Sequence, residues 1–187
     1  MNNSKTHIET NLDLLYDEYI DDLYMYAQNL GFNRQFSMDA IHDVFCRLYT
    51  DKSVLNNVSN IKFYLFRALK NRLIDINRTQ KEFIGHEIDS IANSMPFVLK
   101  VTIEDELIEE EDKRKLEHKV DKILSILTDR QREIIYLRFM QDYDYEEISQ
   151  LMNISVPACH NLMSKTLKKL KDENLSLFLL LLVLLNN

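Results

Sequence analysis

Apolar side chains recur at steps of three and four residues through most of this chain. The spacing holds over residues 12–30, 37–49, 61–76 and 116–127, so each stretch carries an apolar stripe along one side of a helix. Only two glycines and two prolines occur among the 187 residues. Strand-rich proteins need far more turn residues than this. The sequence therefore predicts an all-α protein.

Three amphipathic helices are predicted within residues 1–81. Gly31 stands where a C-terminal cap of the first helix belongs, and Ser37 is the expected cap of the second. A polar break separates the second helix from the third, for which Asn60 is the expected cap. We expect this half to form a bundle of three to four helices.

The helical spacing is lost in residues 82–112. Gly85, Ser-Met-Pro at 94–96 and seven acids without a base in Glu104–Asp112 are typical of a flexible acidic linker. The run Phe97–Ile103 suits either a short strand or an extended segment docked on the protein. The linker would separate the first domain from a second one.

Residues 113–173 return to helical spacing and are predicted to form the second small domain. Thr128 with Gln131, and Asp144 with Glu147, have the spacing of capping boxes, in which each cap side chain binds the amide three residues on. Two helix starts are therefore predicted, after Thr128 and after Asp144.

The stretch Asp142–Asp172 reads as two helices joined by a tight turn, the spacing of a helix-turn-helix. Ser155 is the expected cap of the second helix, and Pro157 falls in its first turn. One side of that helix is apolar. The other carries small, amide and basic side chains, which suit base edges and phosphates in a DNA major groove. An ordinary helical hairpin with a solvated lysine face fits the same pattern.

The candidate DNA-facing residues of this helix lie on its non-apolar side. They are Ser155, Pro157, Ala158, His160, Asn161, Ser164, Lys165, Lys168 and Lys169.

The formal net charge of −7 argues against a nucleic-acid-binding protein, because such proteins usually present a basic surface. The charges are unevenly distributed, however. Lys62–Lys81 contains six basic residues and one acid, and Lys165–Lys171 contains four lysines and no acid. The acidic excess lies mostly outside these two segments, so the net charge does not exclude DNA binding.

Several stretches resemble one family. "LTDRQREIIYLRFMQDYDYEEISQLMNISV" resembles the promoter-recognition domain of bacterial RNA polymerase sigma factors. "LLYDEYIDDLYMYAQNLGFN", "DAIHDVFCRLY" and "FYLFRALKNRLIDINR" resemble the sigma-two domain of the extracytoplasmic-function (ECF) class. The resemblance covers about residues 10–81 and 115–172, in the family's order.

This resemblance implies a division of labour. The helix-turn-helix domain would read the −35 promoter element, and the sigma-two-like domain would bind the polymerase clamp and melt the −10 element. Core RNA polymerase and promoter DNA are thus the expected partners, with a membrane-bound anti-sigma factor as a further one. The linker would thread toward the polymerase active site, with its acids either mimicking nucleic acid or acting as a solvated spacer.

The resemblance also implies which residues of the first domain contact DNA and polymerase. Stacking of bases on aromatic rings would support strand opening, although Tyr64 and Phe66 suit the core equally well. Phe45, in the polymerase-binding set, suits the core slightly better. The residues for the −10 element are Asn56, Asn57, Ser59, Asn60, Tyr64, Phe66, Arg67, Lys70, Asn71 and Arg78. Those for polymerase are Asp43, Phe45 and Arg47.

The second helix of the helix-turn-helix departs from the family pattern. His160 stands where a basic residue is usual, Leu162 replaces an arginine, and Pro157 and Ala158 replace the commoner small residue and Thr. Asn161 and Lys165 are therefore the main candidates for contact with the −35 element.

The Leu-rich tail, 174–187, is too short to span a membrane as a helix. Its Leu-rich run, 175–185, has eleven residues and would reach about 16 Å as a helix, against a hydrocarbon core of about 30 Å. Three interpretations remain: docking on the C-terminal domain, binding to a partner, or contact with a membrane surface or a degradation signal.

Other functions find less support. A response-regulator or quorum-sensing type of helix-turn-helix regulator is the main alternative, but it needs no DNA-melting domain. The five histidines have no catalytic spacing, so neither an enzyme nor a cofactor or metal is expected.

Cys46 and Cys159 are expected to be buried, reduced thiols. Since the N-terminus lacks an apolar signal core, we expect a cytoplasmic protein.

Overall fold

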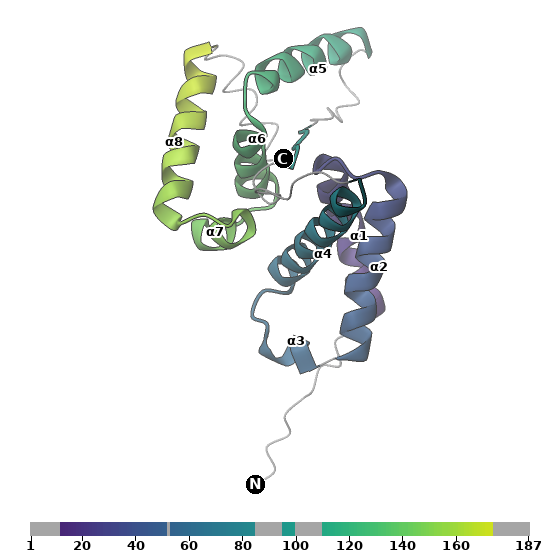
Figure 1. The fold of residues 1–187 in the computed structure, drawn as a ribbon. Coiled ribbons are helices and arrows are strands. Elements are labelled where there is room, and N and C mark those ends of the chain that lie inside the picture. Colours follow the sequence, from purple (N-terminus) through teal and green to yellow (C-terminus); the bar gives the residue numbers. More distant parts are fainter. Residues whose placement is uncertain (1–11, 52, 85–94, 100–109, 174–187) are drawn as a thin grey trace. The chain divides into compact units, whose positions relative to one another are not determined.

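A computed structural model describes residues 12–51, 53–84, 95–99 and 110–173, and every regular element within these ranges is a helix (Figure 1). The chain divides into two compact units. One comprises Met1–Gln28 and Phe32–Glu87, and the other comprises Asn29–Gly31 and Ile88–Asn187. The prediction of an all-α protein with two small helical domains is confirmed.

The first unit is built around three longer helices. In chain order its elements are α1 (Leu12–Asn29), α2 (Arg34–Thr50), the short α3 (Ser53–Asn57) and α4 (Ile61–Ile84). The predicted polar break thus contains a short helix, and α4 runs three residues beyond the predicted end of this domain. Figure 1 shows α2 and α4 side by side.

Aromatic rings join α1 to its two neighbours inside this unit. Tyr16 on α1 meets Phe45 on α2 edge-on, with ring centroids 5.0 Å apart. Tyr26 on α1 packs on Phe66 of α4, with centroids 5.1 Å apart. Phe45, Tyr26 and Phe66 are all at most 2% exposed. These ring pairs contribute roughly 0.5–1.5 kcal/mol each beyond the area that they bury.

Two of the three predicted helix signals in this half are confirmed. Gly31 follows α1 with φ +84°, a left-handed conformation that glycine adopts without strain. The Asn60 side chain accepts a hydrogen bond from the Phe63 amide at 3.0 Å, as expected for the cap of α4.

The prediction that Ser37 caps the second helix is wrong. Asn33 is the cap instead, because its side-chain oxygen accepts from the Phe36 amide at 3.0 Å. Ser37 is fully buried in the first turns of α2, where its hydroxyl donates to the Asn33 carbonyl at 2.8 Å and accepts from Gln28 Nε2 at 3.0 Å. Asn and Ser are both favoured at helix caps, and in α2 the upstream residue, Asn33, is the cap.

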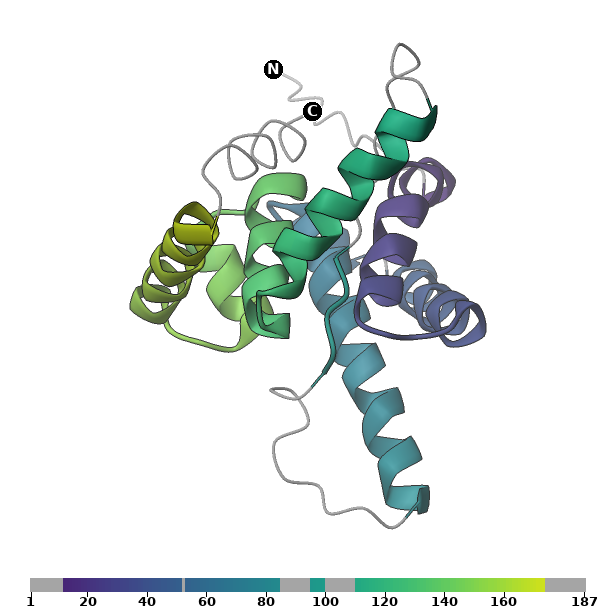
Figure 2. The same ribbon diagram turned by 90° about the horizontal axis from the view of Figure 1, so that it is seen from above.

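The second unit contains α5 (Glu110–Ser125), α6 (Asp129–Ile135), the π-helical segment η2 (Tyr136–Met140), α7 (Tyr145–Met152) and α8 (Val156–Glu173). Contacts join α8 to both α6 and α7. In Figures 1 and 2, α7 and α8 meet at a sharp turn. Helix α5 begins three residues before the predicted start of this domain.

Both predicted capping boxes are present. Thr128 accepts from the Gln131 amide at 3.3 Å while Gln131 accepts from the Thr128 amide at 3.1 Å. Asp144 and Glu147 repeat the arrangement at the start of α7, with distances of 2.8 and 3.1 Å. Substituting such a cap by alanine typically costs about 1 kcal/mol.

Residues 95–99 form an extended segment, which we call the strap, within the second unit. Met95, Phe97 and Leu99 are buried in alternation with exposed Pro96 and Val98. The Phe97 ring packs on Tyr136, with centroids 5.5 Å apart. Over 97–99 the structure therefore favours the docked extended segment over a strand. Residues 100–103 lie outside the described residues.

Arg132 on α6 ties the strap to the helices. Its Nε donates to the Phe97 carbonyl at 2.6 Å, and its Nη1 donates to the carbonyls of Leu127 at 2.6 Å and Leu124 at 3.3 Å. Nη2 pairs with Asp129. One guanidinium thereby binds carbonyl groups at the C-terminal end of α5 and just beyond it, where few helical donors are available.

No helix within the described ranges combines the length and apolar character needed to cross a membrane. The tail, 174–187, and most of the predicted linker lie outside these ranges, so the expectations about them stay predictions.

Candidate nucleic-acid interface

A well-defined turn joins α7 to α8. Asn153 follows α7 in the left-handed conformation (φ 51°, ψ 52°), which asparagine tolerates better than most residues. The Ser155 hydroxyl accepts from the Ala158 amide at 3.3 Å, as predicted for the cap of α8. Arg130 Nη2 donates to the Met152 carbonyl at 2.9 Å, which closes the C-terminal end of α7. Hydrogen bonds thus hold the turn from both sides.

One face of α8 is buried inside the second unit. Cys159, Met163, Thr166 and Leu170 are each at most 3% exposed. The Thr166 hydroxyl donates to the Leu162 carbonyl at 2.7 Å, so burial leaves it satisfied. Burial also raises the pKa of the Cys159 thiol, against a smaller lowering by Arg130. This face fixes the rotation of α8 about its axis.

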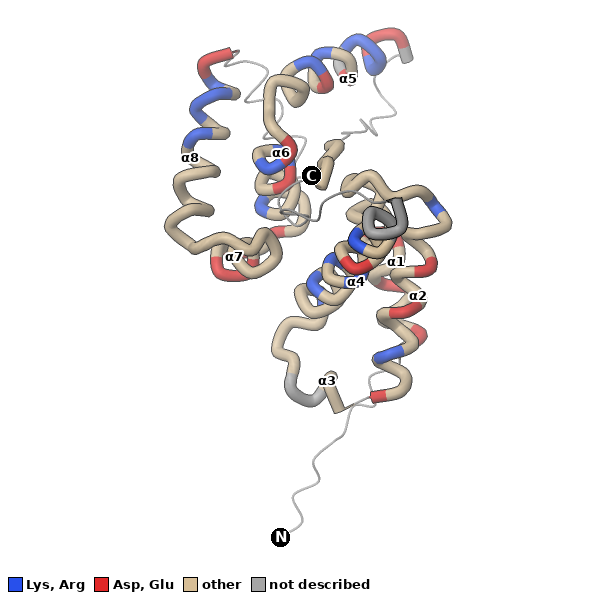
Figure 3. Tube along the Cα trace, in the orientation of Figure 1, with Lys and Arg blue, Asp and Glu red and all other residues tan. Residues whose placement is uncertain are grey.

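The opposite face of α8 is open to solvent. Among the predicted DNA-facing residues only Ala158 is half-buried. The exposed ones are Ser155, Pro157, His160, Asn161, Ser164, Lys165, Lys168 and Lys169. Figure 3 shows the basic residues of α8 gathered in its C-terminal half and further basic residues along α4. Lys169 also donates to the Ile126 carbonyl at 2.5 Å, so its ammonium lies at the end of α5.

His160 is in contact with α7. Its ring lies 3.9 Å from the ring of Tyr145, measured between centroids, with the planes tilted by 34°. The Arg138 guanidinium carbon lies 5.7 Å from the Tyr145 centroid, and Arg138 Nη1 donates to the Tyr143 carbonyl at 2.8 Å. Arg138 and Tyr145 were not predicted as functional residues from the sequence. No periodic signal joins residues on separate helices, so only the fold brings these three together.

Four of the predicted −10 residues on α4 lie on its solvent side. Arg67, Asn71 and Arg78 are exposed and Tyr64 is half-buried. Each residue turns a helix by about 100°, which places these four within one narrow sector. Arg78 Nη2 lies 3.9 Å from Asp75 Oδ1 on the same face of α4.

Two predicted −10 residues on α4 are buried instead. Phe66 is 0% exposed and packs on Tyr26, and Lys70 is 4% exposed. Both follow the spacing of the buried residues Leu69 and Leu73, which turns them toward the interior. The prediction that Phe66 and Lys70 contact DNA is therefore wrong for this conformation.

The loop before α4 is partly described. Ser59 and Asn60 are exposed, and the Asn60 side chain serves as the cap of α4. Asn56 and Asn57 belong to α3, and their side chains lie outside the described residues.

The predicted polymerase-binding residues have different environments on α2. Phe45 is 2% exposed and belongs to the core, so its predicted contact with polymerase is wrong. Asp43 pairs with Arg72 Nε at 2.7 Å, and Arg47 is exposed.

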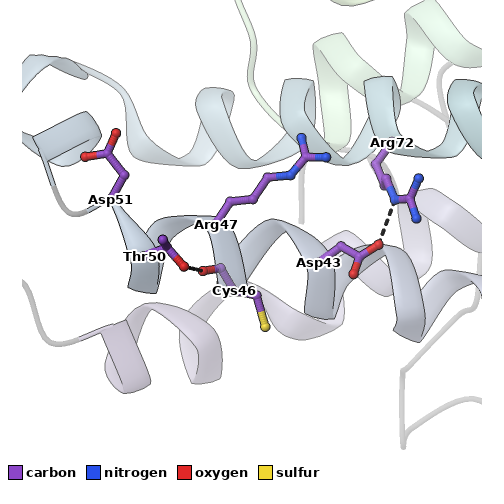
Figure 4. A pocket seen from close by; sticks show the side chains of 6 residues that line it. All are labelled: Asp43, Cys46, Arg47, Thr50, Asp51 and Arg72. Carbon is purple, nitrogen blue, oxygen red and sulfur yellow. Dashed lines mark hydrogen bonds and ion pairs between the residues drawn. The ribbon is translucent and has the colours of Figure 1, made fainter.

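An open pocket of about 540 Å³ lies beside these residues, within the first unit. Figure 4 shows the side chains of Asp43 and Arg47 extending from α2 toward α4, which carries Arg72. The pocket is lined by Asp43, Cys46, Arg47, Thr50, Asp51 and Arg72.

Cys46 is exposed, so the prediction of a buried thiol is wrong for it and right for Cys159. The Cys46 sulfur lies 3.4 Å from His42 Nε2, one helical turn earlier. Within the described part of the chain, no group of three or more potential ligand side chains is arranged to hold a metal ion.

Comparison with known proteins gives matches to both units. Residues 117–170 match the family described as Sigma-70, region 4. The chain is 23% identical over 160 residues to the ECF RNA polymerase sigma factor SigM of Bacillus subtilis (strain 168), covering 86% of this chain and 93% of the relative.

A solved structure has the same fold. It is the sigma factor RpoE of Bartonella quintana, which was crystallised in complex with the anti-sigma factor NepR. It matches with a TM-score of 0.56 and 19% identity over 86% of this chain and 94% of that one. Residues 117–170 thus match the Sigma-70 region 4 family, and over most of its length the chain is similar to an ECF RNA polymerase sigma factor and shares a sigma-factor fold.

Proposed function

We propose that this chain is an ECF-class sigma factor, which binds core RNA polymerase and divides promoter recognition between its two units. The second unit binds the −35 element through α8, and the first unit binds polymerase and melts the −10 element. This proposal rests on the contrast between the two faces of α8. Its inner face is buried and its outer face presents Asn161, Lys165 and Lys168 beside a capped turn.

The outer face of α8 suits the DNA major groove for chemical reasons. The Asn161 amide can donate to and accept from a base edge, and the lysine ammonium groups can neutralise phosphates. Ser155, Pro157, Ala158 and Ser164 are small enough to let the helix approach the bases closely. Lys169 would contribute charge at the edge of this surface.

The solvent face of α4 suits single-stranded DNA. Tyr64 offers a ring for stacking, Arg67 and Arg78 offer positive charge, and Asn71 offers an amide. Ser59 and Asn60 precede this face in the chain. Such a surface favours a sigma factor over a response-regulator type of activator, which has no need to hold an open strand.

Polymerase contact is assigned to the α2 surface around the open pocket. Asp43 and Arg47 lie there with both signs of charge, and Arg72 from α4 fixes the Asp43 carboxylate. We further propose that the chain works in the cytoplasm as a non-catalytic specificity subunit. An anti-sigma protein is a reasonable partner, because the similar RpoE was crystallised with one.

The test is run-off transcription with purified core RNA polymerase and a genomic fragment library from the same organism. We expect start sites that arise only when the chain is added, preceded by a shared pair of sequence elements at −35 and −10. A matched variant, Asn161→Ala with Lys165→Ala, should lose most of these starts while still binding core polymerase. Absence of any chain-dependent start would refute the proposal.

A further inference from the structure

The rings of Tyr145 and His160 form a contact between the two helices of the helix-turn-helix. Their 3.9 Å separation is a close stacking distance. Tyr145 is the first residue of α7, directly after the capping residue Asp144. The capping box joins the residues on either side of it, Asp144 and Glu147, and the Tyr145 ring forms a platform for an otherwise exposed imidazole.

Arg138 lies on the other side of the turn that leads into α7. Its guanidinium is held by the Tyr143 carbonyl at 2.8 Å and lies 5.7 Å from the Tyr145 ring centroid, within the range of a cation–π interaction. Arg138 therefore restrains the platform and adds a positive charge near His160.

The position of His160 on α8 suits the edge of a DNA contact surface. At 100° per residue, His160 is turned by about 90° from the centre of the outer face, on which Asn161 and Lys168 lie. A side chain at this angle is directed to the border of the groove, where the phosphates of a duplex lie, and away from the base edges at its centre. The exposed carboxylates of Asp142 and Glu146 would repel a phosphate bound nearby. The carboxylates of Asp144 and Glu147 accept the hydrogen bonds of the capping box.

We propose that Tyr145, supported by Arg138, positions His160 so that a ring N–H donates to a backbone phosphate at the border of the −35 element. The inference rests on the proposed function and adds Tyr145 and Arg138 as positioning residues. Stacking restricts the rotamers of His160 before binding, so less side-chain freedom is lost when the hydrogen bond forms.

A double-mutant cycle tests the coupling between the two rings. Holoenzyme containing the full chain is titrated against a duplex that carries the −35 element mapped by run-off transcription. We expect His160→Ala and Tyr145→Ala each to weaken binding about tenfold to a hundredfold, the scale of one hydrogen bond to a charged group. The double variant should be no weaker than either single variant. Tyr145→Phe, which keeps the ring, should bind like the wild type.

Controls separate positioning from a general loss of structure. His118→Ala removes an exposed histidine from α5 and should leave affinity unchanged. If Tyr145→Ala weakens binding as much in the His160→Ala background as in the wild type, Tyr145 acts only through folding and the inference fails. It fails as well if His160→Ala alters the ranking of base substitutions instead of weakening all sequences alike, since that result indicates a base contact. Wild-type holoenzyme that shows no affinity for the duplex would count against the proposed function itself.

Discussion

Adjacent residues on the two candidate surfaces have opposite environments. On α4, Phe66 is fully buried and Arg67 is exposed, and on α8 the same is true of Cys159 and His160. The reason is the turn of about 100° per residue, which carries a side chain from the core to solvent within one or two positions. The identity of a candidate DNA contact is therefore decided residue by residue.

Lys165 provides a test at this level. It is exposed near the centre of the outer face of α8, so we expect Lys165→Ala to weaken duplex binding for all promoter sequences alike. Because one phosphate contact would be lost, the slope of log affinity against log salt should fall by about one. Anisotropy titrations of the holoenzyme at several salt concentrations measure this slope. Lys122→Ala, on the exposed side of α5, is the matched control, and an unaltered slope for Lys165→Ala would contradict the assignment.

The helices and the strap are stabilised by different kinds of interaction. The capping boxes before α6 and α7 are local, since all their hydrogen bonds join residues three apart. The strap has no ladder of backbone hydrogen bonds within the described residues. It is held by the hydrogen bond from the Val98 amide to the Asn29 carbonyl at 2.8 Å, by the burial of Phe97 and by the donation from Arg132 to the Phe97 carbonyl. It also lines an open pocket of about 310 Å³ in the second unit, together with α5 and Arg132.

Removal of the Phe97 ring should destabilise the second unit. The ring is 1% exposed against Tyr136, so Phe97→Ala should lower the free energy of unfolding by about 3–5 kcal/mol. Its neighbour Val98 is 48% exposed, and Val98→Ala should cost at most about 0.5 kcal/mol. Urea denaturation followed by circular dichroism measures both. Equal losses from the two variants would show that the strap does not pack as described.

The whole molecule consists of two compact units with separate cores, and its charges are separated as well. A net charge of −7 coexists with basic surfaces on α4 and α8, because the acids gather elsewhere, notably in residues 104–112. Net charge is thus a weak guide to the partners of this protein, and the local surfaces are a better one.

Separated units provide a test of the division of labour. All candidate −35 residues lie in the second unit, so a fragment of residues 88–173 should bind a −35 duplex in mobility-shift assays at low salt. A fragment of residues 1–87 should not, although circular dichroism should show it to be helical. A duplex with the −35 element scrambled is the control. If the fragment of residues 1–87 bound the −35 duplex selectively, the assignment of elements to units would be wrong.

Much of the fold was predictable from the sequence because its signals are local. The apolar stripes, Gly31, Asn60 and the two capping boxes each involve residues only a few positions apart, where the backbone geometry of a helix already determines the neighbours. The outward face of α8 followed from the same periodicity. The family resemblance is likewise carried by short motifs in both units, which the sequence alone displays.

Other features were decided only by the tertiary structure. The cores of the units determine that Phe45 and Phe66 point inward, since an aromatic ring on a helix suits a core and a binding surface equally well. The Tyr145–His160 contact joins residues on two helices, and the bond from Arg132 to Phe97 joins residues 35 positions apart. Such contacts form only after the intervening chain has folded, and no spacing within one helix encodes them.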